Sequence, residues 1–270
     1  MRLAFGVIAS FALLAGACGG GSSPSPQATY GLRGTLTVYA ASSLTDAFNE
    51  IGAAFDAAHT GVTTEFSFTG SPTLRTQLEQ GARADILAVA DQPNMQAALD
   101  KGLVIDAGQT FVRNRLTIIV PKRNPARIMS AADLAKPGTK LVLAQKDVPV
   151  GKYARASIAS MATDPAFAAG FADSTLGNVV SEEPNVKAVV TKVQLGEADA
   201  GIVYATDVTA GVTNDIESIA IPDAYNVTAG YPIAITRDAK HPEIARAFID
   251  FVLSDAGQSI LRTYGFLSAE

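Results

Sequence analysis

Residues 36–43 read Leu-Thr-Val-Tyr-Ala-Ala-Ser-Ser, an apolar strand-like run that passes directly into a helical pattern over residues 44–58. A second junction of this kind lies at Ser71, which is followed by Pro72, a residue favoured in the first turn of a helix. A helix start presents unpaired backbone N–H groups and the positive end of the helix dipole. Two such starts that converge would form a pocket for an anion. The sequence therefore predicts that Ser43 and Ser71 lie at an anion site.

Strands and helices are expected to alternate from residue 35 onward. The expected strands cover residues 36–41, 63–68 and 85–90, and the expected helices cover 45–58, 73–80 and 93–101. This alternation is typical of an α/β fold with a mostly parallel sheet. The apolar run 116–120 ends at Pro121, and we expect it to be the strand that crosses into a second lobe.

The second lobe is expected to contain strands and helices of its own. Its expected strands are 140–144 and 200–205, and its expected helices are 152–161 and 186–195. Residues 231–236 are expected to cross back, before an amphipathic helix over 241–254. The expected boundaries are residues 34–114 plus 231–270 for lobe 1 and residues 115–230 for lobe 2. A chain that crosses twice forms a hinge, and clefts between lobes bind small ligands.

Composition excludes a nucleic-acid surface. The 270-residue chain is 48% hydrophobic and 17% charged, with a net charge of −5 and no cluster of lysine and arginine. This acidity would not attract a small anion over a distance. Salt screens charges beyond roughly 8 Å, so an anion site in this chain must depend on local dipoles.

The N-terminal segment resembles a secretory leader that ends in a lipobox. A weakly positive start is followed by an apolar core over residues 3–14, small residues at 15–17 and Cys18, which is the only cysteine. We expect a signal peptide over 1–17, lipidation of Cys18 and a flexible linker over 18–33. The alternatives are a transmembrane helix, for which the apolar stretch is short, and an unmodified cysteine. Lipidation would place the protein on the extracytoplasmic face of the cell membrane, without a disulfide.

Enzymatic interpretations find little support in the chain. His59 and His241 lie in polar, turn-like surroundings without a partner at metal-ligand spacing. There is no nucleophile elbow and no glycine-rich phosphate loop with lysine. Asp85 and Asp91 flank one expected strand on the same face, where they could form a carboxylate pair. Roles at the strand end and at a helix cap are the alternative for both.

The two serines also have a purely structural interpretation. Ser43 could serve only as a helix N-cap, with Asp46 as a weak capping-box partner, and Ser71 could cap the helix that contains Pro72. Capping and anion binding do not exclude each other, because one helix start can offer both hydroxyl and N–H groups.

Several segments together resemble the molybdate-binding proteins of ABC importers. Val-Tyr-Ala-Ala-Ser-Ser-Leu-Thr at 38–45 is similar to the first strand and elbow of that family. The resemblance covers essentially the whole chain after the linker. It continues at residues 77–86, 90–91, 148–154, 201–204, 248–254, 257–258 and 264–266.

This resemblance implies a two-lobed periplasmic-binding-protein fold of type II and an oxyanion site made of uncharged donors. The donors would be the side chain and backbone N–H of Ser43 and Ser71, the backbone N–H groups of Val150 and Val186, and the hydroxyl of Tyr204. Val150 and Val186 lie at expected helix starts and Tyr204 ends an expected strand. The alternatives are that Val150 is an ordinary loop residue, Val186 an ordinary helix residue and Tyr204 a strand residue packed into the core.

The function implied by the resemblance is capture of molybdate, and of tungstate, for an ABC permease and its ATPase subunits. We expect a monomer without cofactor, without catalytic residues and without a metal held directly by side chains. Two alternatives stay open at this point. One is a receptor for sulfate, phosphate or a small organic anion, and the other is an enzyme on the same scaffold.

Overall fold

The computed structural model describes residues 31–269. The expected signal peptide, Cys18 and most of the expected linker lie outside the described residues. Within the described residues, no helix is both long and apolar enough to span a bilayer.

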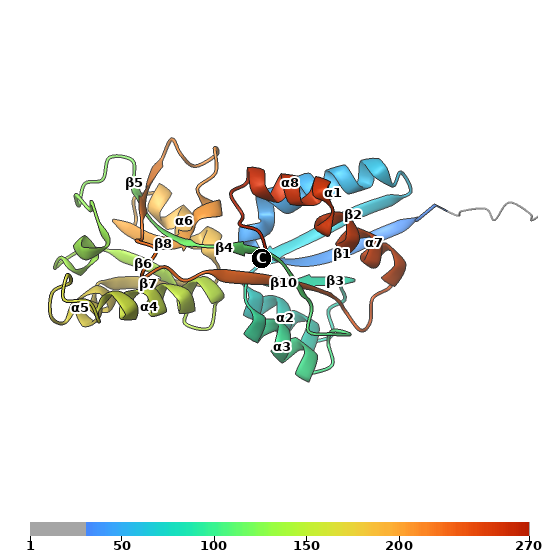
Figure 1. Cartoon of the computed structure of the whole chain (residues 1–270), viewed down its shortest axis with the longest axis horizontal. Coiled ribbons are helices and arrows are strands. Elements are labelled where there is room, and N and C mark those ends of the chain that lie inside the picture. Colours follow the sequence, from blue (N-terminus) through green and yellow to red (C-terminus); the bar gives the residue numbers. More distant parts are fainter. Residues whose placement is uncertain (1–30, 270) are drawn as a thin grey trace, which may run out of the picture. The chain divides into compact units, whose positions relative to one another are not determined.

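Two five-stranded sheets organise these residues (Figure 1). The first sheet has the order β2 (Val62–Thr69), β1 (Gly34–Ala41), β3 (Ile86–Ala88), β10 (Ala229–Ile235) and β4 (Gln109–Asn114). The second has the order β7 (Val179–Glu183), β6 (Leu141–Ala144), β8 (Ala200–Tyr204), β5 (Leu116–Pro121) and β9 (Ile216–Ala220). We call the sheets with their helices lobe 1 and lobe 2.

Both sheets share one topology. Four strands of each sheet run in the same direction, and the fourth in spatial order, β10 or β5, runs against them. The mostly parallel α/β fold is therefore confirmed, with one antiparallel strand in each lobe. These two strands are the first that the chain enters after passing between lobes, at residue 115 and over residues 221–228.

The expected crossing strands are placed differently by the structure. Residues 116–120 belong wholly to the second sheet, and the strand before them, β4, closes the first. The return passage ends before β10, so residues 231–235 lie inside the first sheet and do not cross. The expectation that 116–120 and 231–236 themselves cross was wrong, because fully apolar runs are buried sheet strands and the connections between lobes are more polar.

Helices cover the faces of both sheets (Figure 1). Lobe 1 has α1 (Thr45–Ala58), α2 (Ser71–Glu79), α3 (Gln92–Asp100), α7 (Pro242–Leu253) and α8 (Asp255–Thr263). Lobe 2 has α4 (Pro149–Met161), α5 (Phe171–Gly177) and α6 (Val186–Gln194). Short 3-10 helices occur at Ser42–Leu44, Ala131–Ala135 and Ala205–Asp207.

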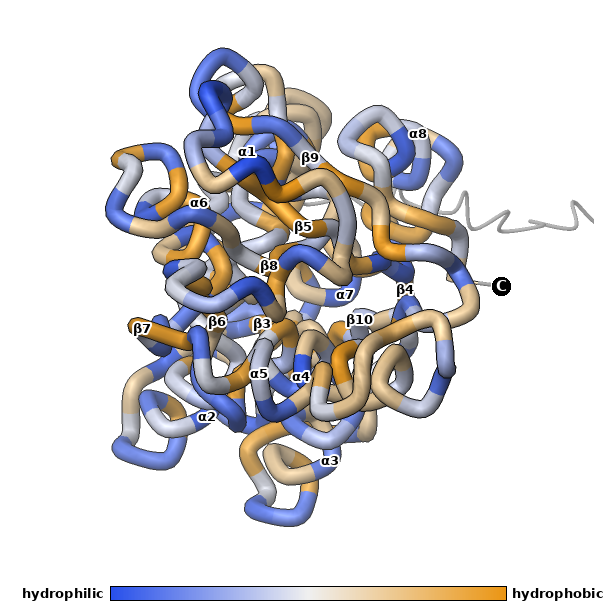
Figure 2. The backbone as a smooth tube through the Cα atoms, turned by 90° about the vertical axis from the view of Figure 1, so that its left-hand side faces the viewer, coloured by the Kyte–Doolittle hydropathy of each residue, from blue (hydrophilic) through white to orange (hydrophobic). Residues whose placement is uncertain are grey.

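The cores lie between these helices and the sheets. Strands such as β5 consist of hydrophobic residues, and many of the outer loops are hydrophilic (Figure 2). In lobe 1, Phe48 and Phe55 of α1 pack against Phe248 of α7 with ring centroids 6.1 and 5.2 Å apart. Phe48 also contacts Phe66 of β2 at 6.0 Å, so aromatic packing joins α1 to both α7 and the sheet.

Candidate functional site

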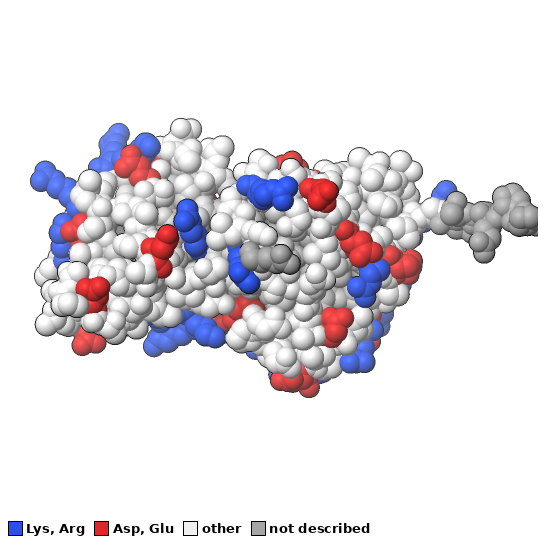
Figure 3. Space-filling model, viewed as in Figure 1, with Lys and Arg blue, Asp and Glu red and all other residues white. Residues whose placement is uncertain are grey.

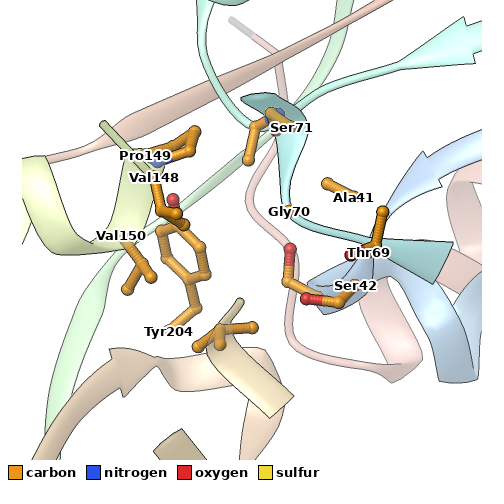
Figure 4. A pocket seen from close by; sticks show the side chains of 12 residues that line it. Ala41, Ser42, Thr69, Gly70, Ser71, Val148, Pro149, Val150 and Tyr204 are labelled. Carbon is orange, nitrogen blue, oxygen red and sulfur yellow. The ribbon is translucent and has the colours of Figure 1, made fainter. Parts of the chain in front are cut away.

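All five residues predicted to bind an anion line one cavity between the lobes, which we call the interlobe cavity (Figure 4). Figure 4 shows Tyr204 and residues 148–150 on one side, facing residues 69–71, Ala41 and Ser42 on the other. The empty volume of the interlobe cavity, which includes space open to solvent, is about 210 Å³. The full lining is Ala41, Ser42, Ser43, Thr69, Gly70, Ser71, Ala90, Val148, Pro149, Val150, Val186 and Tyr204.

The interlobe cavity lies at the carboxyl ends of strands from both sheets. In lobe 1, β1 ends just before Ser42 and β2 ends just before Gly70. In lobe 2, β7 ends three residues before Val186 and β8 ends at Tyr204 itself. Ligands of open α/β sheets bind at this end of the strands. The shared topology of the two lobes therefore directs equivalent strand ends toward one cavity.

Helix N-termini converge on the cavity from both lobes. The 3-10 helix before α1, and α2, α4 and α6, each begin at a residue that lines it or directly beside one. The first turn of each helix has N–H groups without an intrahelical acceptor. The positive ends of these helix dipoles therefore lie at the same cavity, which favours an anion.

At most of these helix starts no N-cap side chain accepts a hydrogen bond from the free N–H groups. The N-cap positions of the 3-10 helix, α1, α2 and α4 are Ala41, Leu44, Gly70 and Val148, and none makes a side-chain cap hydrogen bond. The interpretation of Ser43 and Ser71 as N-caps is therefore wrong. Both lie inside the first turn, where their own N–H groups are among those left for a ligand. Helix α4 begins at Pro149, three residues before its expected start, so Val150 is also in a first turn.

Helix α6 differs because Asn185 caps it. The Asn185 side chain accepts a hydrogen bond from the N–H of Ala188 at 3.0 Å. This bond takes the third N–H of the helix and leaves that of Val186, the residue of α6 that lines the cavity. The expected helix start at Val186 is confirmed.

Both serine hydroxyls are buried and already engaged by the protein. Ser43 Oγ lies 2.9 Å from the hydroxyl of Tyr231 on β10. Ser71 Oγ accepts a hydrogen bond from the backbone N–H of Ala90 at 3.1 Å. Because an N–H can only donate, Ser71 keeps its own proton for another acceptor.

Tyr204 contributes a buried hydroxyl that makes no hydrogen bond of ordinary geometry with the described residues, although the phenol of Tyr231 lies near it. It is only 1% exposed, and its oxygen is fully buried without a hydrogen bond. Its ring packs edge-on against Tyr231 at 5.7 Å. Burial raises the pKa of Tyr204 well above its usual value, so the phenol stays protonated as a donor. An unpaired buried polar group is costly, which favours a ligand oxygen as its partner.

Lysine and arginine are absent from the lining of the interlobe cavity. Lys187 directly follows Val186, but its ammonium is paired with Asp46 of α1 at 2.8 Å and with Asp207 at 3.5 Å. Burial lowers the pKa of Lys187, but Asp207 and Asp46 outweigh it and raise the pKa overall. On the face in Figure 3 the charged side chains are scattered across the surface. The electrostatic attraction inside the cavity therefore comes from dipoles.

The other titratable candidates have structural roles. Asp85 accepts hydrogen bonds from the N–H groups of Thr37 and Lys240 at 2.8 and 2.6 Å. Asp91 is the N-cap of α3 and accepts from Asn94. The alternative of strand-end and capping roles is confirmed for both carboxylates.

Neither histidine lines the interlobe cavity. The Nδ1 atom of His59 contacts the carbonyl of Phe55 at 3.0 Å, and His241 precedes α7 as its N-cap residue. Among residues 31–269, no group of three or more histidine, cysteine, aspartate and glutamate side chains could hold a metal ion.

Sequence reasoning missed several residues at the site. Ser42, Thr69 and Gly70 line the cavity, and their position at the two strand ends was a usable signal. Tyr231 and Asn114 were missed for a different reason. Their contacts with Ser43 and with Thr206 join residues far apart in the chain, so local patterns contain no trace of them.

Comparison with known proteins gives matches over nearly the whole described chain. Residues 36–267 match the family described as bacterial extracellular solute-binding protein. The chain is 38% identical over 266 residues to the molybdate-binding protein ModA of Mycobacterium bovis, covering 96% of this chain and 95% of that protein. It is 30% identical over 241 residues to the molybdate-binding protein ModA of Escherichia coli, covering 86% and 89%.

Solved structures share the fold at lower identity. The sulfate-binding protein SubI of Mycobacterium tuberculosis superposes with a TM-score of 0.79 at 17% identity, covering 87% of each chain. The periplasmic molybdate-binding protein of Azotobacter vinelandii superposes with a TM-score of 0.74 at 17% identity, covering 87% of this chain and all of the other. These likenesses show the fold, with two lobes.

Proposed function

Because the chain belongs to the bacterial extracellular solute-binding proteins, and among them to the ModA family, we propose that it binds molybdate for an ABC importer. Its relatives in this family are solute-binding proteins. The observation that supports molybdate is the donor set of the interlobe cavity. It combines helix N-termini, serine hydroxyls and an unpaired phenol, without a cationic side chain in the lining.

We propose that Ser43, Ser71, Val150, Val186 and Tyr204 are the binding residues. Two hydroxyl and N–H pairs, two further N–H groups and one phenol would supply about seven hydrogen bonds, at roughly 1.5–3 kcal/mol each to a charged acceptor. The sum is on the order of 10–20 kcal/mol, from which loss of ligand freedom removes several. The remainder is compatible with micromolar or tighter binding.

The size of the cavity would decide between oxyanions. Molybdate, tungstate and sulfate are all tetrahedral dianions, so charge and acceptor pattern do not separate them. We propose that the interlobe cavity fits the larger group-six oxometallates, tungstate as well as molybdate. Sulfate or phosphate is the competing ligand, because a SubI-like fold also houses a sulfate receptor.

We further propose that binding closes the lobes. Residues 34–114 with 231–270 would move against residues 115–230 about the two connections, and the ion would complete a shell that neither lobe supplies alone. The closed monomer would then deliver the ion to the permease and its ATPase subunits. Cys18, which is outside the described residues, would carry the lipid anchor on the extracytoplasmic face of the membrane.

Calorimetric titration tests the ligand directly. Purified protein from residue 31 onward is titrated with molybdate, tungstate, sulfate and phosphate, and we expect heat of binding with the two oxometallates. The double variant Ser43→Ala, Ser71→Ala should abolish this heat and keep the circular dichroism spectrum. Heat with sulfate or phosphate alone, or unchanged affinity in the folded double variant, would contradict the proposal.

The anchor is tested separately. Full-length protein should sediment with membranes after expression in a bacterial host, and Cys18→Ala should release it into the extracytoplasmic soluble fraction. Equal membrane association of both proteins would refute lipidation at Cys18.

A further inference from the structure

A chain of buried hydrogen bonds connects the passage between the lobes with Ser43. It begins at Asn114, the last residue of β4, which has no exposed surface and directly precedes the connection into lobe 2. Asn114 Oδ1 accepts the backbone N–H of Arg115 at 2.9 Å. The other end of the amide is thereby fixed as the donor, Nδ2.

The two protons of Asn114 Nδ2 both have acceptors. One is Thr206 Oγ1 at 2.7 Å, and the other is the hydroxyl oxygen of Tyr231 at 3.3 Å. Tyr231 therefore accepts from Asn114 and has a single proton of its own to place. Ser43 Oγ lies 2.9 Å away.

The phenol of Tyr231 retains that proton at physiological pH. Tyr231 has no exposed surface, and burial raises the pKa of its phenol far above the usual value. A buried hydroxyl proton without an acceptor would be costly. The Ser43 Oγ atom, at 2.9 Å, is the acceptor that the described residues place within hydrogen-bond distance of this proton. We therefore assign the direction of the chain as Asn114 to Tyr231 and Tyr231 to Ser43.

Ser43 Oγ is in consequence an acceptor toward the protein, and its own proton is left for the interlobe cavity. Ser71 reaches the same state by a different route, because its Oγ accepts from the backbone N–H of Ala90. Both serines are thus oriented as donors by groups that donate to them. With the unpaired phenol of Tyr204, the hydroxyls at the cavity offer protons to a ligand.

We propose that Tyr231 and Asn114 are positioning residues that hold Ser43 as a donor and so make the site select fully deprotonated oxyanions. This inference rests on the proposed function, in which Ser43 touches the ligand. A molybdate ion has only acceptor oxygens and accepts every donated proton. A hydrogen phosphate ion carries one O–H group that needs an acceptor. In the interlobe cavity this O–H group would instead face the Ser43 hydroxyl, which is a donor.

Tyr231→Phe tests the chain with the smallest change. It removes one oxygen and keeps the ring, whose centroid lies 5.7 Å from those of Tyr204 and Phe266. We expect molybdate affinity to fall about 5- to 20-fold, the size of one weakened hydrogen bond to a charged group. The ratio of molybdate to phosphate affinity at pH 7.5 should fall too, because Ser43 can then accept from the phosphate O–H.

A double-variant cycle separates positioning from packing. In a Ser43→Ala background, Tyr231→Phe should change affinity less than about twofold, since its effect passes through Ser43. Tyr264→Phe is the matched control, because the Tyr264 hydroxyl bonds Glu50 at 2.8 Å away from the cavity. It should leave both the affinity and the ion ratio as in the wild type.

Asn114→Asp reverses the chain without a change of size. The carboxylate would accept the Tyr231 proton, so Ser43 would have to donate to Tyr231 and lose its proton for the ligand. We expect a loss of affinity at least as large as that of Tyr231→Phe, with the fold verified by thermal melting.

The outcomes are distinct for the two proposals. Equal losses from Tyr231→Phe with and without Ser43, or an unchanged affinity and ion ratio, would overturn the positioning role and leave the proposed function standing. A wild-type protein that binds no oxyanion would overturn both.

Discussion

Replacing Tyr204 by phenylalanine removes one oxygen atom from the interlobe cavity and breaks no hydrogen bond of ordinary geometry among the described residues. The ring keeps its edge contact with Tyr231 at 5.7 Å. The substitution therefore separates ligand binding from folding more cleanly than either serine does, since each serine also bonds a group of the protein.

The expected magnitude follows from the environment of the hydroxyl. A hydrogen bond to a charged acceptor contributes about 1.5–3 kcal/mol, so molybdate affinity should fall about 10- to 150-fold. The free protein should not lose stability, because an unpaired buried hydroxyl opposes folding and does not support it. The stabilisation by saturating molybdate should shrink by the same 1.5–3 kcal/mol, or about 3–12 °C in melting temperature for a chain of this size.

Two assays measure these effects. Titration calorimetry gives the affinity, and differential scanning calorimetry with and without molybdate gives the melting temperatures. Tyr264→Phe serves as the control and should keep wild-type affinity. An affinity within about threefold of the wild type would show that Tyr204 does not touch the ligand. A lower melting temperature of the free variant would show that its hydroxyl is bonded within the protein.

Three further substitutions probe closure and the buried charges. Gly70→Ala should weaken molybdate binding about fivefold or more, because a Cβ there would lie 2.3 Å from the carbonyl oxygen of Pro184 in the other lobe. Gly177→Ala is the control in the same calorimetric titration, because a Cβ at Gly177 meets open space. Equal affinities of the two variants would contradict this prediction. Burial raises the pKa of Asp207 to about 6 in the folded protein, from an ordinary 3.8. The folded state thus binds this proton more tightly, so the ionised carboxyl lowers stability above pH 6 and the penalty fades as the pH falls toward 4. Relative to Asp207→Asn, the wild type should gain about 2 kcal/mol in urea unfolding between pH 7.5 and pH 4.5, and parallel pH profiles would refute this. Lys187→Met removes the cation beside Asp207 and should destabilise the protein more at pH 7.5 than at pH 4.5, whereas equal losses at both pH values would mean that the pair does not interact.

The sequence predicted those parts of the fold in which neighbours along the chain decide the outcome. The junction from β1 into α1 and the start of α6 were found because apolar periodicity, a turn residue and a capping residue lie within a few positions. Strands β7 and β9 were missed because they are edge strands whose residues are mostly exposed or half-buried and include several polar ones, as in Val-Val-Ser-Glu-Glu over 179–183, so they contain no continuous apolar run.

The candidate site shows the same limit. Ser43 and Ser71 were assigned to a ligand site from their position at strand ends, and the structure brings both to one cavity. The partner of Ser43 lies 188 residues further along the chain, and the ion pair of Lys187 with Asp46 spans 141. Such contacts depend on how the two lobes pack, so no local pattern could have revealed them.

A crystal structure of the molybdate complex, with the ion located by anomalous scattering from molybdenum, tests the central claim most directly. We predict one molybdenum peak in the interlobe cavity, with its oxygens bonded to Ser43, Ser71, Tyr204 and main-chain N–H groups of both lobes. A peak elsewhere, or a lysine or arginine side chain bonded to the ion, would contradict it.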